Sequence, residues 1–330
     1  GYLDKPDSDD VTVDKAFETV KSARKVLNNL YYEVRTAAYN VNTRKIPYAQ
    51  ACDDGLPGSG LWGDKFHSGS WTPDDDPNMG DDNQGGSPTC SFWNNTYKRV
   101  RKANLFLENL YRAKGDESEK TRMYAEARFL RAFYYSELVR RFGGIIILDH
   151  SIDANDYSAL TNQPRETFEN SVEWVCNELT EAARDLPPVC SASDVGRATD
   201  AACYAVMARL RITAASPLFN DGQPYLDGEA STNLMVWYGN KSDQRWQDVV
   251  DACKEFEQAN NSGSYYYQLV ETGDYRQDFQ DAWYKRRNGE VLISTRVAYT
   301  CPDIWNGDFY FMQSAGWYGC SCPTLNYMDM

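Results

Sequence analysis

The feature of this 330-residue chain that most limits its fold is a spacing of three or four positions between apolar residues, repeated in six segments. This spacing places apolar side chains along one face of an α-helix, whereas a half-buried strand alternates at every second residue. The clearest example runs through Ala16, Val20, Ala23, Leu27, Leu30 and Val34. The predicted helices cover approximately residues 16–34, 93–111, 119–142, 168–186, 199–215 and 246–256. The pattern therefore predicts a mostly α fold.

Several of these helices are bounded by residues that start or stop a helix. Thr12 is expected to cap the first helix, because a threonine oxygen can accept a hydrogen bond from a free backbone N–H group. Gly143 and Gly144 are expected to end the third helix. Proline cannot continue a helix, so the Pro187-Pro188 pair and Pro217 are expected to end the next two.

The fourth and fifth predicted helices repeat at a fixed distance. Phe168 and Ala201 occupy comparable places in these helices, about one tetratricopeptide period apart. The full tetratricopeptide consensus sequence is missing, so the prediction rests only on the length of the repeat and on the alternation of helix, turn and helix. We therefore predict tetratricopeptide-like stacked helical hairpins with long irregular loops and a loop-rich second region. Two short apolar runs, IIIL at 145–148 and VLISTRV at 291–297, are expected to be extended.

The helical pattern is interrupted between residues 51 and 91. This stretch is rich in Gly, Pro, Asp and Asn and reads as a long loop, and loops of this length are usually functional or disordered. Its large aromatic residues argue against disorder. We predict a helical scaffold over residues 1–260 with this loop inserted, followed by an irregular, aromatic-rich region over 261–330.

Composition excludes several functional classes. The net charge is -14 and the sequence pI is about 4.7, and an acidic surface repels nucleic acid and anionic membranes. No run of about 18 apolar residues exists, so no transmembrane helix is expected. The two histidines, His67 and His150, cannot build a histidine-rich zinc site. The nine cysteines form no CxxC pair, and those in helical segments are expected to act as small apolar residues.

Four segments together resemble one known family. They are AEARFLRAFYYSELVRRFGGIIILD at 125–149, GRATDAACYAVMARLRITAASPLFN at 196–220, RETFENSVEWVCNELTEAARDLP at 165–187 and FWNNTYKRVRKANLFLENL at 92–110. Their composition and their order along the chain are similar to those of the SusD/RagB nutrient-binding lipoproteins of Bacteroidetes. The resemblance extends over almost the whole chain.

The resemblance implies a tetratricopeptide-like scaffold and a location on the outer face of the outer membrane. The implied anchor is a lipidated cysteine just upstream of Gly1. The implied partner is a TonB-dependent SusC-like transporter, and the implied ligands are oligosaccharides, or peptides in some members. No catalysis is expected. Two departures stand out: Ile146 occupies a place where proline is usual, and the chain stops at PTLNYMDM, where the family has a further C-terminal portion.

Sugar binding needs flat aromatic faces together with polar side chains that orient hydroxyl groups. Trp93 and Trp246 fall on helical apolar stripes and are expected in the core, while Trp174 can be assigned either way. The remaining aromatic residues of irregular segments are candidates for stacking. The expected glycan-binding residues are Trp62, Trp71, Trp283, Tyr284, Trp305, Trp317 and Tyr318, with Asp64, Asn83 and Arg287 as polar partners. The competing interpretation is that each aromatic ring only holds its loop onto the scaffold.

One acidic run partly matches the pattern of a calcium-binding loop. Asp74, Asp76 and Asn78 alternate as the ligands of such a loop do, but Met79 stands where glycine is required and Gly85 replaces the closing acid. The run is therefore expected to be a solvated loop. No metal site, no cofactor and no catalytic residue are predicted.

Three alternatives remain open on the sequence. An all-α glycoside hydrolase needs only two carboxylates, so the scarcity of histidine does not exclude it. A RagB-like member would bind peptides with the same aromatic loops. A scaffold that only docks other proteins through its helical repeats would bind no small ligand at all.

Overall fold

The computed structural model describes residues 13–38, 55–57, 69, 91–153, 155–261, 267–285, 287–294 and 321–323. The chain divides into two compact units. The first comprises Gly1–Val34 and Lys98–Thr295, and the second comprises Arg35–Tyr97 and Arg296–Met330. The predicted division near residue 260 stays a prediction.

The described residues are mostly helical, as the apolar spacing predicts. The helices are α1 (Val13–Ala16), α2 (Val20–Ala38), α4 (Ser91–Asn109), η2 (Leu110–Arg112), α5 (Glu117–Phe142), α6 (Tyr157–Thr161), α7 (Phe168–Asp185), α8 (Asp200–Ala215), α9 (Glu229–Thr232), α10 (Gln244–Asn261) and α11 (Tyr275–Tyr284). No described helix is both long and apolar enough to cross a lipid bilayer.

A two-stranded antiparallel sheet lies in the second unit. Strand β1 (Gly55–Pro57) pairs with β2 (Ser321–Pro323), with Leu56 opposite Cys322. The sheet joins the loop after the first long helix to the C-terminal segment, two regions far apart in the sequence. The sequence pattern did not predict it, because three-residue strands are too short to show an alternating pattern.

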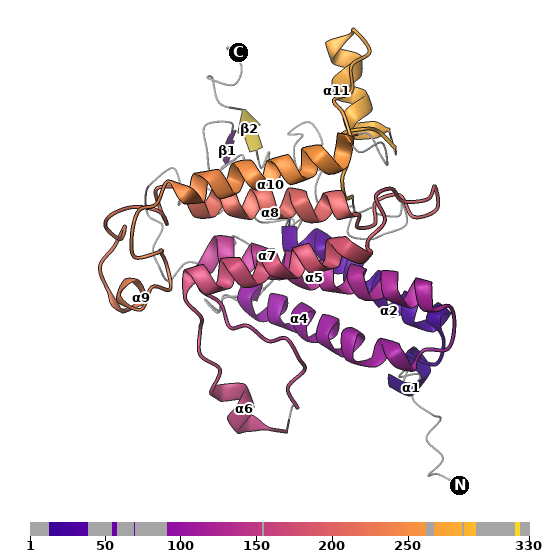
Figure 1. Cartoon of the computed structure of the whole chain (residues 1–330), viewed down its shortest axis with the longest axis horizontal. Coiled ribbons are helices and arrows are strands. Elements are labelled where there is room, and N and C mark those ends of the chain that lie inside the picture. The colour runs from indigo at the N-terminus through magenta and orange to yellow at the C-terminus, as the bar shows by residue number, and fades with distance from the viewer. Residues whose placement is uncertain are drawn as a thin grey trace. The chain divides into compact units, whose positions relative to one another are not determined.

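The first unit is a stack of helices in chain order. Helix α5 packs on α7, α7 on α8, and α8 on α10 (Figure 1). This arrangement of successive helical pairs is the tetratricopeptide-like stack that the sequence predicts. The other side of α5 contacts α2 and α4, since the Tyr134 hydroxyl donates to the carbonyl of Leu30 and Arg131 donates to Asn104.

Helix α5 is the centre of this stack, and its middle is buried on every face. Nearly every side chain from Met123 to Val139 is shielded from solvent. A helix buried all round needs neighbours on all sides, which explains why α5 has no single apolar stripe. Its buried residues include three charged side chains, those of Glu126, Arg131 and Glu137.

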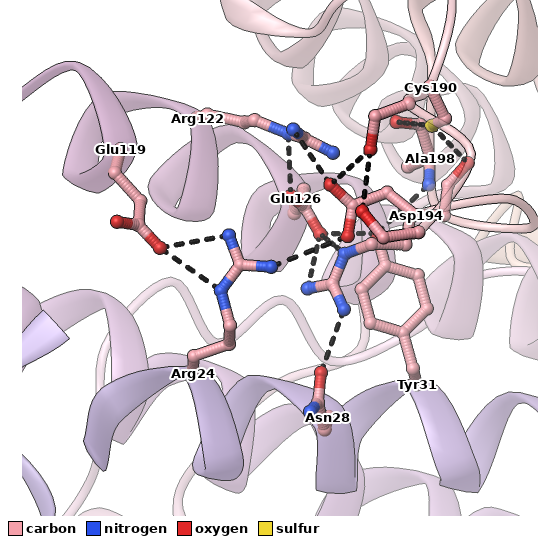
Figure 2. Close-up of polar contacts among 12 residues, drawn as sticks. Arg24, Asn28, Tyr31, Glu119, Arg122, Glu126, Cys190, Asp194 and Ala198 are labelled. Carbon is pink, nitrogen blue, oxygen red and sulfur yellow. Dashed lines mark hydrogen bonds and ion pairs between the residues drawn. The ribbon is translucent and has the colours of Figure 1, made fainter. Parts of the chain in front are cut away.

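Glu126 is the hub of a buried polar cluster (Figure 2). Its carboxylate lies 3.1 Å from Nε of Arg122 and accepts hydrogen bonds from Nε of Arg197 at 2.8 Å and from the Tyr31 hydroxyl at 2.8 Å. Arg197 also donates to Asn28 of α2 at 2.7 Å, and its guanidinium lies over the Tyr31 ring. The cluster therefore joins α2, α5 and the segment that precedes α8.

The other two buried charges of α5 face different helices. Arg131 donates to Asn104 of α4 at 2.7 Å and to Glu178 of α7 at 2.6 Å. Glu137 accepts a hydrogen bond from Arg209 of α8 at 2.6 Å. Each charged side chain thus has a partner on another helix, and its burial does not leave an uncompensated charge.

The two glycines that follow α5 let three segments approach closely. Gly143 has a φ angle of +76°, and a Cβ atom there would lie 2.3 Å from the carbonyl oxygen of Met235. A Cβ atom on Gly144 would lie 2.0 Å from the carbonyl oxygen of Glu166. The glycine pair therefore both ends the helix, as predicted, and leaves room for the chain before α7 and after α9.

The predicted helix ends are confirmed in most places, with one shift at the start. Helix α7 begins at Phe168, and Thr199 caps α8 by accepting a hydrogen bond from the N–H of Ala202. The first long helix begins at Val20, where Thr19 and Ser22 cap each other, and the short helix α1 precedes it. Thr12, the predicted cap, lies outside the described residues.

Two smaller predictions are wrong. Trp246 is 44% exposed rather than in the core, because α10 ends the stack and buries only Val249 and Ala252 fully. Residues 145–148, predicted to be extended, belong to no described helix or strand, and that prediction stays a prediction; Ile145 is buried, and its N–H donates to the Ser171 hydroxyl. The described part of the second predicted strand, 291–294, is also irregular. Apolar runs of this length indicate burial without deciding the backbone conformation.

We predict that Glu126→Gln lowers the free energy of unfolding by about 3 kcal/mol, because it removes the buried carboxylate that pairs with the half-buried Arg122 and Arg197. Urea denaturation followed by circular dichroism measures the change. Glu117→Gln is the matched control, since the Glu117 side chain is 85% exposed and its surface ion pair contributes little. Equal stability of the two variants would contradict a structural role for the cluster.

A second prediction concerns pH. Burial alone would raise the pKa of Glu178, but hydrogen bonds and charges from Arg128 and Arg131 outweigh burial and hold the pKa below its usual value of 4.5. A group whose pKa is lowered on folding stabilises the fold at pH values above its unfolded-state pKa. That stabilisation is lost as the pH falls through the folded-state pKa. The difference in stability between the wild type and Glu178→Gln should therefore be largest near neutral pH and shrink below about pH 4.5. A pH-independent difference in urea midpoint would refute this account.

Candidate functional site

The described part of the aromatic-rich C-terminal region contains a short helix, α11. Its N-terminus is capped by Asp274, which accepts hydrogen bonds from the N–H groups of Arg276 and Gln277. At the other end, the Asn288 side-chain amide donates to the carbonyl oxygens of Ala282 at 2.9 Å and Lys285 at 3.2 Å. Both ends therefore have the partners that a short helix needs.

Helix α11 carries an exposed aromatic stripe, which we define as Tyr275, Phe279 and Trp283, and a fourth exposed ring, that of Tyr284, on another face of the helix. Their exposed fractions are 92%, 68%, 74% and 85%. The first three are spaced four residues apart and so share one helix face. The rings of Phe279 and Trp283 lie 6.2 Å apart with an interplanar angle of 50°. Large aromatic groups that gather on an exposed face usually mark a binding surface.

The position of α11 explains this exposure. The helix lies beyond the C-terminal end of α10 and projects away from the stack (Figure 1). Its buried side chain is the polar Asp281, which bonds to Gln277 of the same helix and to Lys285, the residue that follows the helix. The aromatic side chains of α11 consequently do not contribute to the core of the first unit.

A pocket of about 270 Å³ is lined in part by residues that precede and follow α11 in the sequence. One wall comes from the segment between α7 and α8 and consists of Val189, Cys190, Val195, Gly196, Arg197 and Thr199. The other wall comes from the residues on either side of α11 and consists of Tyr267, Arg287, Asn288, Val291 and Leu292. The pocket thus combines aliphatic surface with hydroxyl, amide and guanidinium groups.

Polar contacts hold the two walls together. The hydroxyl groups of Thr199 and Tyr267 lie 3.3 Å apart, and the N–H of Ser294 donates to the carbonyl of Gly196 at 3.3 Å. Gly196 has a φ angle of +98°, and a Cβ atom there would lie 2.6 Å from the carbonyl oxygen of Ser294. Glycine at this position therefore permits the close contact between the walls.

The titratable groups of the pocket differ in their charge. Burial raises the pKa of the Tyr267 hydroxyl and of the Cys190 thiol, so both are neutral near pH 7. Burial opposes the charge of Arg197, but the Glu126 carboxylate outweighs it and the pKa of the guanidinium is raised. Arg287 is exposed and forms no hydrogen bond or ion pair with any described residue. Among the described residues, the pocket therefore has one cation without a partner, Arg287.

The structure places three of the predicted ligand-binding residues. Trp283 lies on the stripe, Tyr284 is exposed on another face of α11, and Arg287 lines the pocket a few residues further on. The remaining predicted residues lie outside the described ranges: Trp62, Trp71, Trp305, Trp317, Tyr318, Asp64 and Asn83. The candidate calcium loop lies outside them as well. The predicted site as a whole stays a prediction.

Several residues of this region were not predicted from the sequence. Tyr275 and Phe279 share a helix face with Trp283, and their four-residue spacing could have been found in the sequence. Thr199 and Tyr267 were not predictable as neighbours, because they are far apart in the chain and only the packing of α8 brings them together.

Comparison with known proteins identifies related chains. The sequence model of a SusD-like family, described as starch-binding and associating with the outer membrane, matches residues 2–212. SusD-like protein P2 of Formosa agariphila is 31% identical over 140 residues, which are 40% of this chain and 27% of that protein. The aligned part is thus just over a quarter of that relative.

Two solved structures have the same fold. The protein BT4246 matches with a TM-score of 0.68 and 22% identity over 94% of this chain and 56% of that one. A SusD-like protein from Bacteroides fragilis matches with a TM-score of 0.60 and 24% identity over 89% of this chain and 47% of that one. The chain spans about half the length of these proteins, and the likeness confirms the predicted fold class.

We predict that Gly196→Ala lowers the free energy of unfolding by about 1–3 kcal/mol, because alanine is strained at this positive φ angle and its Cβ would press on Ser294. Chemical denaturation measures the loss. Gly222→Ala is the control, since a Cβ atom there meets nothing within 4 Å. If both substitutions are equally harmless, the walls of the pocket do not meet as described.

Proposed function

Because the chain belongs to the SusD-like family, we propose that it binds oligosaccharides at the cell surface without catalysing a reaction. The resemblance seen in its four sequence segments is confirmed by the family match. The family is described as starch-binding and associating with the outer membrane, which supports a glycan as the ligand class for this chain.

The observation that carries the proposal is the exposed aromatic stripe on α11. The C–H faces of a sugar ring stack on flat aromatic surfaces, and such surfaces are rigid before the ligand arrives. Phe279 and Trp283 present neighbouring rings, and both remain exposed to solvent. A glycan lying along this face would cover apolar surface that the fold itself leaves open.

The same role is proposed for the aromatic residues that the sequence analysis selected elsewhere. Trp62, Trp71, Trp305, Trp317 and Tyr318 are expected to extend the stacking surface, with Asp64 and Asn83 orienting hydroxyl groups. Substituting them one at a time and measuring oligosaccharide binding would show which of these residues belong to the binding site.

Delivery of the captured glycan to a TonB-dependent SusC-like transporter completes the proposed function, together with lipid anchoring at the outer surface of the outer membrane. The outer-membrane association of the family supports this location. Capture beside a transporter needs only modest affinity, since it raises the local concentration of the ligand.

The chemistry of the pocket agrees with a binding role. No aspartate or glutamate is among the residues that line it, so it offers no pair of carboxylates for glycoside hydrolysis. The raised pKa of Cys190 leaves no thiolate to act as a nucleophile. The proposal that the protein holds its ligand and leaves it unchanged rests on the family match.

We predict that Trp283→Ala weakens oligosaccharide binding at least about tenfold, equivalent to about 1.4 kcal/mol, while the melting temperature stays unchanged. A glycan array followed by calorimetric titration measures the effect. Tyr225→Ala is the control, because Tyr225 is 79% exposed and lies outside α11. Unchanged binding after substitution of both Phe279 and Trp283 would remove the stripe from the site.

The same array should carry peptides, since a RagB-like member would bind those instead. Release of new reducing ends from the glycans that bind would show hydrolysis. Binding of peptides alone, or the appearance of reducing ends, would contradict the proposed function.

A further inference from the structure

The pocket differs from the rest of this acidic chain in its charge. The chain has 48 acidic residues and a net charge of -14, yet none of the eleven residues that line the pocket is acidic. At physiological salt the charges of the distant acidic residues are screened beyond about 8 Å. The nearby carboxylates of Glu126 and Asp194 act on Cys190, and that of Asp200 acts on Tyr267, but none of them is among the groups that line the pocket.

The two arginines of the pocket have different roles. Arg197 is occupied, since it donates to Glu126 and to Asn28 and stacks on Tyr31. Its charge is neutralised by Glu126, and it serves as part of the wall. Arg287 pairs with no described residue, so its planar group of donors is available to a ligand. An unpaired guanidinium prefers a carboxylate, which it can bind through two parallel hydrogen bonds.

The other residues that line the pocket indicate which kind of molecule carries the carboxylate. Thr199 and Tyr267 contribute neutral hydroxyl groups that bond to each other, and the Asn288 amide is bonded to α11 and to the N–H of Glu290. A hydroxyl group has one donor and two lone pairs, so Thr199 and Tyr267 suit a ligand with hydroxyl groups. Val291 and Leu292 add aliphatic surface that can contact C–H groups. The volume of about 270 Å³ lies just below the range of about 300–1,000 Å³ typical of small-molecule sites, and it suits a single sugar ring.

We propose that this pocket binds a carboxylate-bearing sugar residue, such as a uronic acid unit, with Arg287 holding the carboxylate. The proposal rests on the proposed function, because it names the class of glycan and adds a subsite to the aromatic stripe. Asn288 connects the two places, since it lines the pocket and its amide caps the C-terminal end of α11.

The test is calorimetric titration of the whole chain with three small probes at about 0.15 M salt, the ionic strength at which surface charges are screened. The probes are glucuronate, glucose and an N-acetylated dipeptide with a free C-terminal carboxylate. We expect glucuronate to bind about tenfold more tightly than glucose, because a charged hydrogen bond is stronger than a neutral one. Arg287→Met should abolish that preference.

Arg276→Met is the matched control, because Arg276 is an exposed arginine of α11 that does not line the pocket. It should keep the full preference for glucuronate. Arg287→Lys keeps the charge but loses the paired donors, so it should keep part of the preference. This second variant preserves the test if Arg287→Met does not fold, as judged by circular dichroism.

Several outcomes would overturn the proposal: no saturable binding of glucuronate, equal affinity for glucose, or an equal loss in the Arg276→Met control. Tighter, Arg287-dependent binding of the dipeptide would assign the pocket to a peptide carboxylate instead. Failure here is distinguishable from failure of the proposed function. Neutral oligosaccharides that still bind through Trp283 would preserve that function, whereas a chain that binds no oligosaccharide would lose it even if free glucuronate entered the pocket.

Discussion

The charged side chains buried in α5 are the constraint on which the rest of the first unit depends. Moving a charge out of water is costly unless an opposite charge and hydrogen bonds replace the solvent. Glu126, Arg131 and Glu137 therefore require partners that other helices must supply, and α4, α7, α8 and the segment before α8 supply them. A helix that shifted along its neighbour would leave a charge unpaired. We infer that the charges select one register for the stack, while apolar packing provides most of its stability.

The same interactions shape the candidate binding region. Arg197 stands between the buried cluster and the pocket, because its guanidinium binds Glu126 while the residue lines the pocket wall. Two residues later, Thr199 caps α8 and meets Tyr267 of the opposite wall. A pocket formed by two irregular segments is thereby attached to the most deeply buried part of the fold. Such support reduces the ordering that binding would otherwise require.

The aromatic stripe on α11 has a different physical character. Its rings do not pack in the core, so their apolar surface stays in contact with water. The helix persists because its ends are capped and because Asp281 binds Gln277 and Lys285 along it. The side chains that stabilise α11 and the aromatic stripe proposed to bind the ligand thus lie on opposite faces of this short helix. Substitutions on the aromatic face can consequently change binding while the fold stays intact.

The sequence by itself determined the helical class, most helix boundaries and the family, because these follow from local spacing, capping residues and contiguous motifs. It also identified Trp283, Tyr284 and Arg287 as candidate ligand-binding residues, since aromatic and cationic residues in a loop-rich region can be recognised from the sequence. Tertiary structure alone decided that Trp246 is exposed and that Thr199 meets Tyr267. Burial and contact between distant segments depend on which neighbours a helix receives. That choice is made by packing and charge pairing across the whole unit, which no local pattern contains.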